Sequence, residues 1–473
     1  MTPVISVLMP VYNPALRFLE EVIESVRAQS YAPWELCVAD DRSTDERVRP
    51  FLEEKGKRDS RIKLVFREAN GGIAACSNSA LALAGGDWGA LLDQDDLLAE
   101  NALSEVAREI TAHPDAGLIY SDEDFVDASG ERINPFFKPD WNPELFLGQN
   151  YLNHLGVYRL ELLREIGGFR AGFEGSQDYD LALRTCARLR PEQIRHIPRI
   201  LYHWRMVTGS LADQPDAKPE ARHAARRALN SYLREQDIAA EAVACQENAE
   251  SHRVIYELPK PPPEVAILRL PAGAAEANRA ARATEADVLI FLSDEIEADD
   301  PAWSDEMLCL VVRPEIGAVG ARLWSASGTL EDGALILGLG GVATPAFYGI
   351  PRGHPGYFNR AWLTQNFSAV SAACLAVRKD VFLELNGFDE RNLPEHFYDV
   401  DFCLRLRERG LQVVWTPYAN LTWRGAGLRP EAQTSSEAVW MKQRWGEQLE
   451  RDPFYNPNLS RDLPGFRFEP CSR

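Results

Sequence analysis

The stretch LLDQDDLL at residues 91–98 places three carboxylates within four positions, directly after an apolar run that begins at Trp88. A short apolar run that ends in polar turn residues is typical of a buried β-strand. Asp93, Asp95 and Asp96 are therefore expected in the turn after a strand. The chain already has a formal net charge of −20. Three acids in one turn repel one another unless a cation or a hydrogen-bond donor offsets them.

Strands and helices alternate upstream of this turn. Apolar, β-branched runs predict strands at residues 4–9, 34–39 and 62–67, and helical spacing predicts helices at 18–29 and 74–84. This alternation indicates an α/β fold with a mostly parallel, Rossmann-like sheet, whose ligands gather at the carboxyl ends of the strands. Asp40-Asp41 and the DQDD turn both fall at such ends. Together they favour a divalent metal that bridges nucleotide phosphates, whereas either turn alone also suits ordinary helix capping.

Composition narrows the class of protein. With 473 residues and 45% hydrophobic side chains, the chain is long enough for two or three domains. The eight cysteines lie far apart, as in a reduced cytoplasmic protein. We expect neither a signal peptide nor a membrane span, since glycines interrupt the longest uncharged stretch, 333–350. The acidic balance argues against nucleic acid as a partner. The expected location is the cytoplasm, with at most peripheral contact with the inner face of the membrane.

Six motifs resemble family 2 glycosyltransferases of the GT-A fold, in the order and spacing of that family. They extend over about 200 residues and read PVYNP (10–14), ADDRSTD (39–45), NGGIAACSN (70–78), LLDQDDLL (91–98), EGSQDYDLALR (174–184) and HIPRILYHWR (196–205). The second half of the chain is similar to the second module of tandem bacterial polysaccharide or O-antigen glycosyltransferases of the rhamnosyltransferase type.

The resemblance implies a binding site for a nucleotide-sugar donor and a divalent cation, Mn²⁺ or Mg²⁺. It assigns the nucleotide base to Asp41 and to a pocket shaped by the PVYN segment, and it assigns ribose and metal to the carboxylates of the DQDD turn. The nucleotide-sugar-binding residues so implied are Pro10, Tyr12, Asp41, Asn78, Asp93 and Asp95, and the implied metal ligands are Asp96 and His203. From the residues alone, His203 equally suits a buried histidine at a strand end.

Asp178 is the expected catalytic base. A sugar hydroxyl has a pKa far above neutral and needs a base, and an ordinary aspartate is ionised at pH 7. Asp178 resembles the Asp of the family's Glu-Asp pair and opens a helix predicted at 178–189, although Gln177 stands where the family has Glu. The resemblance implies inversion at the anomeric carbon. Capping of the helix N-terminus is a compatible second role for Asp178.

The second half of the chain repeats the first. VYRLELLREIGGF (157–169) returns as AVRKDVFLELNGF (376–388), and QDYDLALR (177–184) returns as YDVDFCLR (398–405). The copy is about 60 residues shorter before its acidic turn, which reads SDE (293–295), and Trp423 takes the place of His203. The expected loss comprises the first strand, the first helix and the DD strand.

We therefore expect a catalytic GT-A domain at 1–215, a helix and Pro-rich linker at 216–263, a degenerate GT-A-like domain at 264–445 and a tail at 446–473. The degenerate domain would be a scaffold, an acceptor platform or a homodimer interface. The Ala- and Arg-rich helix at 217–236 suits packing on the first domain or contact with a membrane surface.

Three functions follow in order of preference. The first is a metal-dependent inverting glycosyltransferase that moves a sugar from a UDP- or dTDP-linked donor to a hydroxyl of a growing surface glycan, plausibly lipid-linked. The second is a non-catalytic glycan-binding or scaffold protein in a synthase complex. The third, a sugar nucleotidyltransferase, would need a basic, glycine-rich loop after the first strand, and PVYNPALRF is not one.

Overall fold

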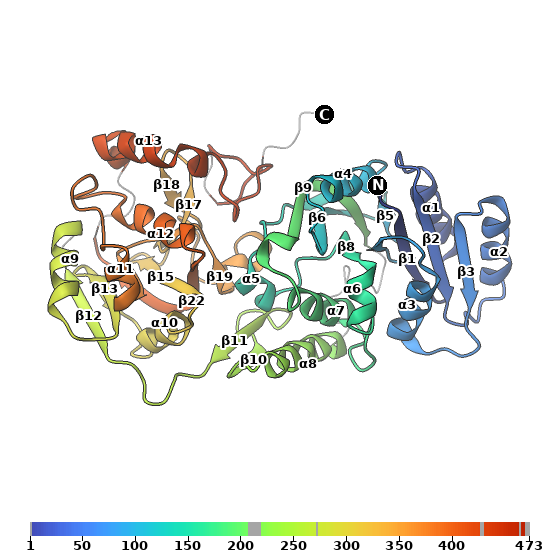
Figure 1. Ribbon diagram of the computed structural model, residues 1–473, viewed down its shortest axis with the longest axis horizontal. Coiled ribbons are helices and arrows are strands. Elements are labelled where there is room, and N and C mark those ends of the chain that lie inside the picture. The colour runs from blue at the N-terminus through green and yellow to red at the C-terminus, as the bar shows by residue number, and fades with distance from the viewer. Residues whose placement is uncertain (1, 207–218, 271–272, 426–429, 463–464, 469–473) are drawn as a thin grey trace. The chain divides into compact units, whose positions relative to one another are not determined.

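The computed structural model describes residues 2–206, 219–270, 273–425, 430–462 and 465–468. They belong to two compact units, each with its own α/β sheet (Figure 1). Unit 1 comprises Met1–Trp141 and Asn150–Ile238, and unit 2 comprises Asn142–Gln149 and Ala239–Arg473. The expected domain boundary between residues 215 and 216 lies outside the described residues.

Unit 1 contains the strands and helices expected around the acidic turns. Its strands are β1 (Ile5–Val11), β2 (Trp34–Asp40), β3 (Ile62–Phe66), β4 (Trp88–Leu91), β5 (Leu97–Leu98), β6 (Leu118–Val126), β7 (Arg132–Phe136), β8 (Gly156–Arg159) and β9 (Ile194–Arg205). Its helices are α1 (Leu16–Arg27), α2 (Val48–Arg58), α3 (Gly72–Leu83), α4 (Ala102–Ala112), α6 (Leu160–Glu165), α7 (Gln177–Cys186) and α8 (Pro219–Glu235).

The sheet of unit 1 has the strand order β3-β2-β1-β4-β8-β6-β9-β5, with β7 beside β6. The pairs β2-β3, β1-β2, β1-β4 and β6-β9 are parallel, and β8 is antiparallel to both of its neighbours. Val11 lies opposite Asp40, and Leu8 lies opposite Leu91. This register brings the PVYN, DD and DQDD turns to one edge of the sheet, as the sequence predicts.

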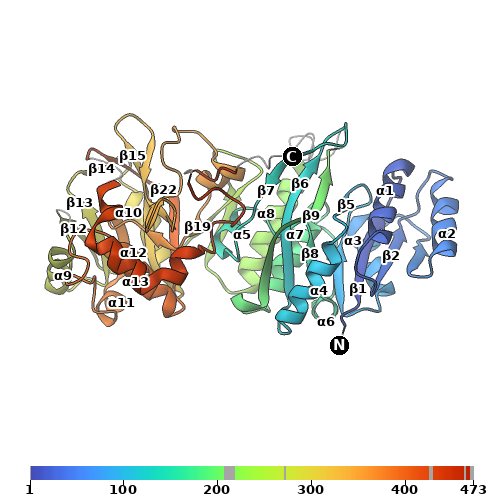
Figure 2. The same ribbon diagram turned by 90° about the horizontal axis from the view of Figure 1, so that it is seen from above.

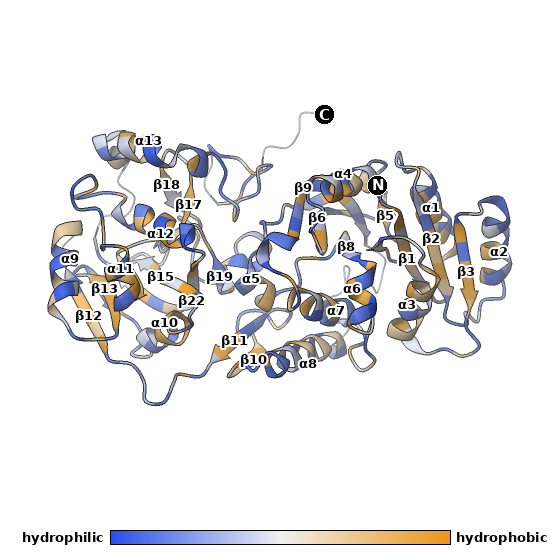
Figure 3. Ribbon diagram, viewed as in Figure 1, coloured by the Kyte–Doolittle hydropathy of each residue, from blue (hydrophilic) through white to orange (hydrophobic). Residues whose placement is uncertain are grey.

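A continuous apolar core holds this edge in place. The α1 side chains Leu19, Val22, Ile23 and Val26 are buried against the sheet, at the i, i+3, i+4, i+7 spacing of an amphipathic helix. In Figure 3, β1 and β3 are coloured mainly as hydrophobic, whereas α1 has both hydrophobic and hydrophilic residues. The turns at the strand ends are thus fixed to a rigid scaffold.

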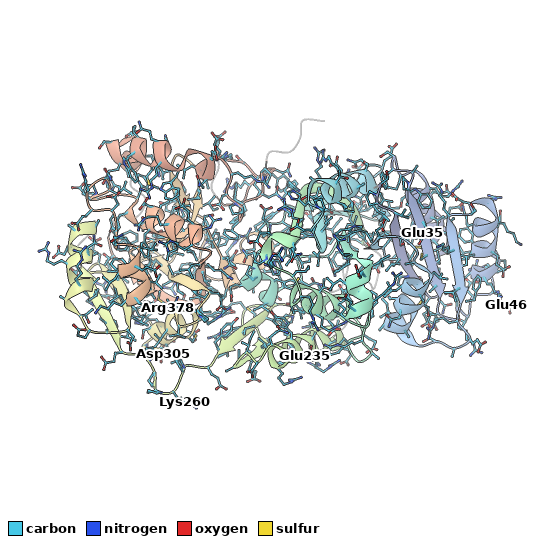
Figure 4. The ribbon with its side chains drawn as sticks, in the orientation of Figure 1. Glu35, Glu46, Glu235, Lys260, Asp305 and Arg378 are labelled. Atoms are coloured by element: carbon cyan, nitrogen blue, oxygen red, sulfur yellow. The ribbon has the colours of Figure 1, made fainter. Side chains whose placement is uncertain are left out.

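Helix α8 packs on α7 within unit 1. Its alanines and leucines at 224, 225, 228, 229 and 233 are buried. Glu235 (labelled in Figure 4) forms an ion pair of 2.7 Å with Arg170. Of the two expectations for this helix, packing on the first unit is the one that the structure bears out. None of the helices that the structure describes is long and apolar enough to cross a membrane.

The described residues of unit 2 form an eight-stranded sheet, a three-stranded sheet and a two-stranded sheet. Its strands are β10 (Ala240–Ala244), β11 (His252–Tyr256), β12 (Val265–Leu270), β13 (Val288–Ser293), β14 (Ile296–Ala298), β15 (Ile316–Ser325), β16 (Leu330–Asp332), β17 (Ala334–Leu337), β18 (Ala343–Pro345), β19 (Gln365–Asn366), β20 (Ala369–Val370), β21 (Cys374–Arg378) and β22 (Gln412–Trp423). Its helices are α5 (Pro143–Gly148), α9 (Ala274–Ala283), α10 (Trp303–Val311), α11 (Lys379–Glu384), α12 (Tyr398–Glu408) and α13 (Ser436–Glu450). Both α10 and α12 pack on β15 and β22 (Figure 2).

The larger sheet of unit 2 repeats the topology of unit 1. Its order, β12-β13-β21-β15-β22-β14, has the same sequence of parallel and antiparallel pairs as β1-β4-β8-β6-β9-β5. Strand β12 thus stands where β1 stands, and β2 and β3 have no counterpart in the described sheet. The expectation that the first strand is missing is therefore wrong, because the deletion falls between that strand and the helix before the acidic turn.

Side-chain contacts confirm the repeat. Asn78 of α3 pairs with the backbone N–H and C=O of Phe169, and Asn278 of α9 pairs in the same way with those of Phe388. Arg378 (labelled in Figure 4) donates to the backbone carbonyls of residues 311, 313 and 316 at 2.7–2.8 Å. Its repeat partner Arg159, at the end of β8, donates in the same way to the carbonyls of residues 114 and 116 at 2.7 Å. The two units therefore share the same strand order and the same side-chain contacts between their helices and loops.

Candidate active site

A cavity of about 560 Å³ opens at the carboxyl ends of β1 and β4 and extends to the start of α7. It lies where an α/β sheet commonly binds ligands. Six of the residues predicted from the sequence line it, namely Pro10, Tyr12, Asp41, Asp93, Asp95 and Asp178. These six residues come from four separate segments of the chain that the fold brings to one site.

The acidic turn is anchored at its inner end and open at its outer end. Asp96 is 1% exposed, and its carboxylate accepts hydrogen bonds from Tyr202 Oη at 2.6 Å and from the backbone N–H of Arg205 at 2.8 Å. The side chain of Asp93 is 50% exposed. Strand β9 therefore holds the turn through Asp96, while Asp93 faces the cavity.

The PVYN segment is joined to the acidic turn by one amide side chain. Gln94 Oε1 accepts the backbone N–H of Tyr12 at 2.8 Å, and Gln94 Nε2 donates to the Tyr12 carbonyl at 3.3 Å. The Tyr12 ring is exposed at the cavity rim. Gln94 thus gives the second position of the DQDD turn a structural role, because it fixes the wall that carries Pro10 and Tyr12.

Asp41 orders the far wall of the cavity. Its carboxylate accepts the backbone N–H groups of Gly71 and Gly72, each at about 3 Å, and lies 2.7 Å from Arg67 Nε. Gly72 has a φ of 80°, a conformation that glycine adopts at low cost. The loop before α3 is therefore held against β2 by the second acid of the DD turn.

His154, just before β8, is a site residue that the sequence analysis did not select. Its Nδ1 lies 2.9 Å from Glu123 Oε2, and its Nε2 lies 4.0 Å from Asp93 Oδ2. The imidazole ring stacks on Tyr202, with 4.5 Å between ring centroids. The only sequence signal was its place in the polar stretch Asn150–His154, directly before a strand.

A buried lysine supports His154. Lys138 is fully buried, donates to the carbonyls of Asn153 and His154 and lies 3.7 Å from Glu123. Burial lowers the pKa of Lys138. Burial alone would raise the pKa of Glu123, but the charges of Lys138 and His154 and the hydrogen bonds from His154 outweigh it, so the pKa of Glu123 is lowered. Glu123 is thus ionised and orients the His154 ring.

Asp93, Asp96 and His154 form a group that fits a divalent metal ion. One ligand atom from each lies within 4.8 Å of the other two. Carboxylate oxygens and imidazole nitrogen suit Mn²⁺, and the carboxylates also suit Mg²⁺. Burial, with the charges of Asp95 and Asp178, raises the pKa of Asp93 to about 6, and burial raises that of Asp96 as well. Against the effect of burial, Glu123, Asp93 and Asp96 raise the pKa of His154 to about 9.

Asp178 lies in the cavity wall at the first turn of α7. The side-chain amides of Asn150 and Asn153 both donate to its Oδ2, the first at 3.2 Å. Burial raises the pKa of Asp178, while the positive charge of His154 and the helix N–H groups oppose the rise. A carboxylate with a raised pKa is a stronger base, provided that it stays ionised.

Besides the buried Asp96, two predicted site residues lie outside the cavity lining. Side chains alternate along a strand, so Tyr202 and Trp204 of β9 face the cavity and His203 does not. His203 Nδ1 instead lies 2.6 Å from Asp124 Oδ1 in the neighbouring β6. His203 therefore lies outside the candidate metal group of Asp93, Asp96 and His154, contrary to the expected pairing of His203 with Asp96.

Asn78 is the second such residue. Its side-chain amide donates to the Phe169 carbonyl and accepts the Phe169 N–H, so Asn78 fixes the loop after α6 to α3. We expect Asn78→Ala to lower the free energy of unfolding by about 1–3 kcal/mol, the cost of unpaired polar groups, with unchanged nucleotide affinity. Urea unfolding of this variant and of the matched Asn278→Ala checks this. Weaker nucleotide binding at unaltered stability would contradict it.

The comparisons with known proteins agree with this site. Residues 6–167 match the family model for glycosyl transferase family 2. An uncharacterized protein of Sinorhizobium fredii is 39% identical over 98% of the chain and 58% of its own length. An O-antigen biosynthesis protein, RfbC of Myxococcus xanthus, is 31% identical over 97% of the chain and 40% of its own length. The chain thus spans only about half the length of these relatives.

Two similar solved structures contain a bound nucleotide sugar. One is Staphylococcus aureus TarS 1–349 with UDP-GlcNAc, at 20% identity and a TM-score of 0.40 over 49% of the chain and 66% of that structure. The other is the mannosyltransferase PcManGT of Pyrobaculum calidifontis with GDP-Man and Mn²⁺, at 19% identity and a TM-score of 0.38 over 50% of the chain and 65% of that structure. The family match therefore identifies residues 6–167 as a glycosyltransferase domain of family 2.

Proposed function

We propose that unit 1 is a metal-dependent, inverting glycosyltransferase that uses a UDP- or dTDP-sugar. The observation that carries this proposal is a single cavity lined by Asp93, His154 and Asp178. A metal-binding group and a base in one volume match the two needs of sugar transfer, which are a stabilised leaving group and an activated nucleophile. A purely glycan-binding protein has no need of both.

The donor would bind between the two walls of the cavity. Tyr12 and Pro10 on one side, and the loop ordered by Asp41 on the other, leave a slot at the ends of β1 and β2 for the base. Asp93 and Asp95 would face the ribose and the diphosphate. When bound, a divalent ion held by Asp93, Asp96 and His154 would neutralise the charge of the leaving diphosphate as a Lewis acid.

Asp178 would take the proton of the acceptor hydroxyl. The amides of Asn150 and Asn153 hold its carboxylate in one orientation, and burial makes it more basic. A single displacement, in which the acceptor oxygen forms a bond to the anomeric carbon as the bond to diphosphate breaks, inverts that centre. The proton passes from the acceptor oxygen to Asp178 Oδ, which balances the step.

The acceptor would be a hydroxyl of a growing bacterial surface glycan, lipid-linked at the inner face of the cytoplasmic membrane. The name of the Myxococcus relative, O-antigen biosynthesis protein, supports this class of acceptor. Membrane contact would be peripheral and the protein cytoplasmic. A homodimer through unit 2 would be compatible with this role.

The test is calorimetric titration of UDP and dTDP with Mn²⁺ into the whole chain and into Asp96→Asn. One nucleotide site per chain, lost on substitution of Asp96, supports the proposal and identifies the base. Two sites would place a donor in unit 2 as well. Absence of nucleotide binding, with no EDTA-sensitive release of diphosphate from donor sugars, would favour the scaffold alternative.

Metal binding should also release a proton. With pKa values of about 9 for His154 and about 6 for Asp93, at pH 7 the histidine is protonated and the aspartate largely ionised. A metal needs both deprotonated, so Mn²⁺ uptake at pH 7 is expected to displace about one proton. Apparent affinity should rise with pH up to about 9. Titration in two buffers of different ionisation enthalpy measures the proton count, and zero protons would contradict His154 as a ligand.

A further inference from the structure

Unit 2 contains its own cavity, of about 430 Å³, at the end of β13 and the start of α12. Its place in the repeat is that of the unit 1 cavity. Asp399 lies in the first turn of α12 as Asp178 lies in that of α7, and Phe388 lines the wall as Phe169 does. A volume of this size is sufficient for a small ligand.

The donor-binding features of unit 1 do not recur there. The repeat places Ala373 at the position of His154, and the strands that would carry a counterpart of Asp41 are absent from the described sheet. Within the described part of unit 2, His, Cys, Asp and Glu form no three-ligand metal group. Unit 2 therefore has a cavity at the corresponding place, but its described residues include no metal-binding group that could neutralise a diphosphate.

The lining is acidic and has no strong base. Among its described residues there is neither lysine nor arginine, and six are acids: Asp294, Glu295, Glu331, Asp332, Glu395 and Asp399. Such a wall repels phosphate and other anions. Carboxylates are strong acceptors for hydroxyl donors, so a neutral polyol remains the best match for a ligand.

Two of these carboxylates are fixed in place and keep accepting capacity. Asp399 accepts the backbone N–H groups of Ala372 and Val400, each at 2.9 Å. Asp332 accepts Ser371 Oγ at 2.6 Å. An ionised carboxylate accepts about four hydrogen bonds. Both groups can therefore accept further donors from a ligand without moving.

Aromatic rings complete the lining. Tyr398 and Trp423 are partly exposed at the cavity, and Phe291 and Phe388 are buried behind them. Trp423 is fixed by a hydrogen bond of 3.2 Å from its Nε1 to Glu295. Flat apolar faces beside fixed acceptors complement a pyranose ring, which has an apolar face and a rim of hydroxyls.

We propose that the cavity of unit 2 is a binding site for an uncharged saccharide, without transfer activity. Hydroxyls of the sugar bond to Asp332 and Asp399, and its apolar face lies on Trp423. The binding itself does not depend on the activity of unit 1. Only the identification of this saccharide as part of the acceptor glycan rests on the proposed function. In that case unit 2 would retain the glycan.

The test is saturation-transfer NMR of the full chain with methyl glycosides of L-rhamnose, D-glucose, D-galactose and N-acetylglucosamine, and with spermidine as a cationic probe. Transfer to at least one glycoside is expected in the wild type and in Asp93→Asn, with loss in Trp423→Ala and in the isosteric Asp399→Asn. Trp423→Phe should retain part of the signal. Thermal unfolding of each variant shows whether unit 2 still folds.

Three results would overturn the proposal. They are transfer that persists in both unit 2 variants, no transfer to any glycoside, and transfer to spermidine alone. Titration of UDP with Mn²⁺ on the same samples separates the two proposals. If Trp423→Ala loses glycoside binding but keeps nucleotide binding, both the donor site of unit 1 and the saccharide site of unit 2 are supported. If the chain binds a glycoside but no nucleotide, only the saccharide site is supported.

Discussion

Asp178→Asn is expected to lower turnover about a thousandfold, within the range for loss of a general base, and to leave nucleotide affinity unchanged. Asparagine has the shape of aspartate and still offers an oxygen to the amides of Asn150 and Asn153. It cannot accept a proton at neutral pH. The variant thus separates the proton transfer from the architecture of the cavity.

The measurement is release of nucleoside diphosphate from sugars linked to the nucleotide that the calorimetry identifies, with water as the acceptor. Asp399→Asn is the matched control, because Asp399 opens α12 in the repeat but lies in unit 2. It should retain the wild-type rate of hydrolysis. Equal loss in both variants, or no loss in Asp178→Asn, would remove Asp178 from the role of base.

The sheet of unit 1 was predictable because its signals are local. Apolar runs of four to seven residues, each ended by a polar turn, mark β1, β2, β3 and β4, and parallel strands place their carboxyl ends together. The turns that hold Asp41 and Asp93 therefore converge whatever the details of packing. Four segments of the cavity lining were identified from this rule and from the family motifs.

His203 shows where local signals end. It lies in a motif next to cavity residues, but the period of two along β9 turns its side chain away from them. The sequence does not reveal which parity faces the cavity, because Tyr202, His203 and Trp204 are all aromatic or polar. Pairing with Asp124 across the strands, a long-range contact, decides it.

Unit 2 shows the same limit for a deletion. Its shortened beginning was evident from the spacing of motifs, but the missing strands could be named only from the pairing of β12 with β13. The sequence pattern of a strand at the start of a module is the same whether that strand corresponds to β1 or to β3. Neighbours in the sheet distinguish the two, and they are not neighbours in the chain.

His154 gave the weakest signal of all, because it lies in an irregular segment without periodicity. Its position depends on Lys138, which binds its carbonyl, and on Glu123, which binds its ring. The three residues come from separate segments of unit 1, and only Glu123 lies in a strand. A buried network of this kind is specified by tertiary packing, because Lys138 and Glu123 lie 16 and 31 positions before His154 in the chain.

His154→Ala is accordingly expected to weaken Mn²⁺-dependent nucleotide binding at least about 100-fold, the upper end of the loss caused by removing a supporting partner of a metal ligand. His203→Ala should leave that affinity within a few-fold of wild type. The substitution of His154 removes one of three candidate ligands and also leaves Glu123 without its ring partner.

Glu123→Gln distinguishes these two effects, because it keeps the hydrogen bond to the ring but removes the charge that raises the pKa of His154. With a lower pKa, His154 gives up its proton more readily, so the number of protons released on Mn²⁺ binding at pH 7 should fall. If His203→Ala abolished nucleotide binding while His154→Ala did not, the metal ligand would be the residue that the motif first indicated. If His154→Ala weakened nucleotide binding but Glu123→Gln released as many protons as wild type on Mn²⁺ binding, His154 would be a support for Asp93 rather than a metal ligand.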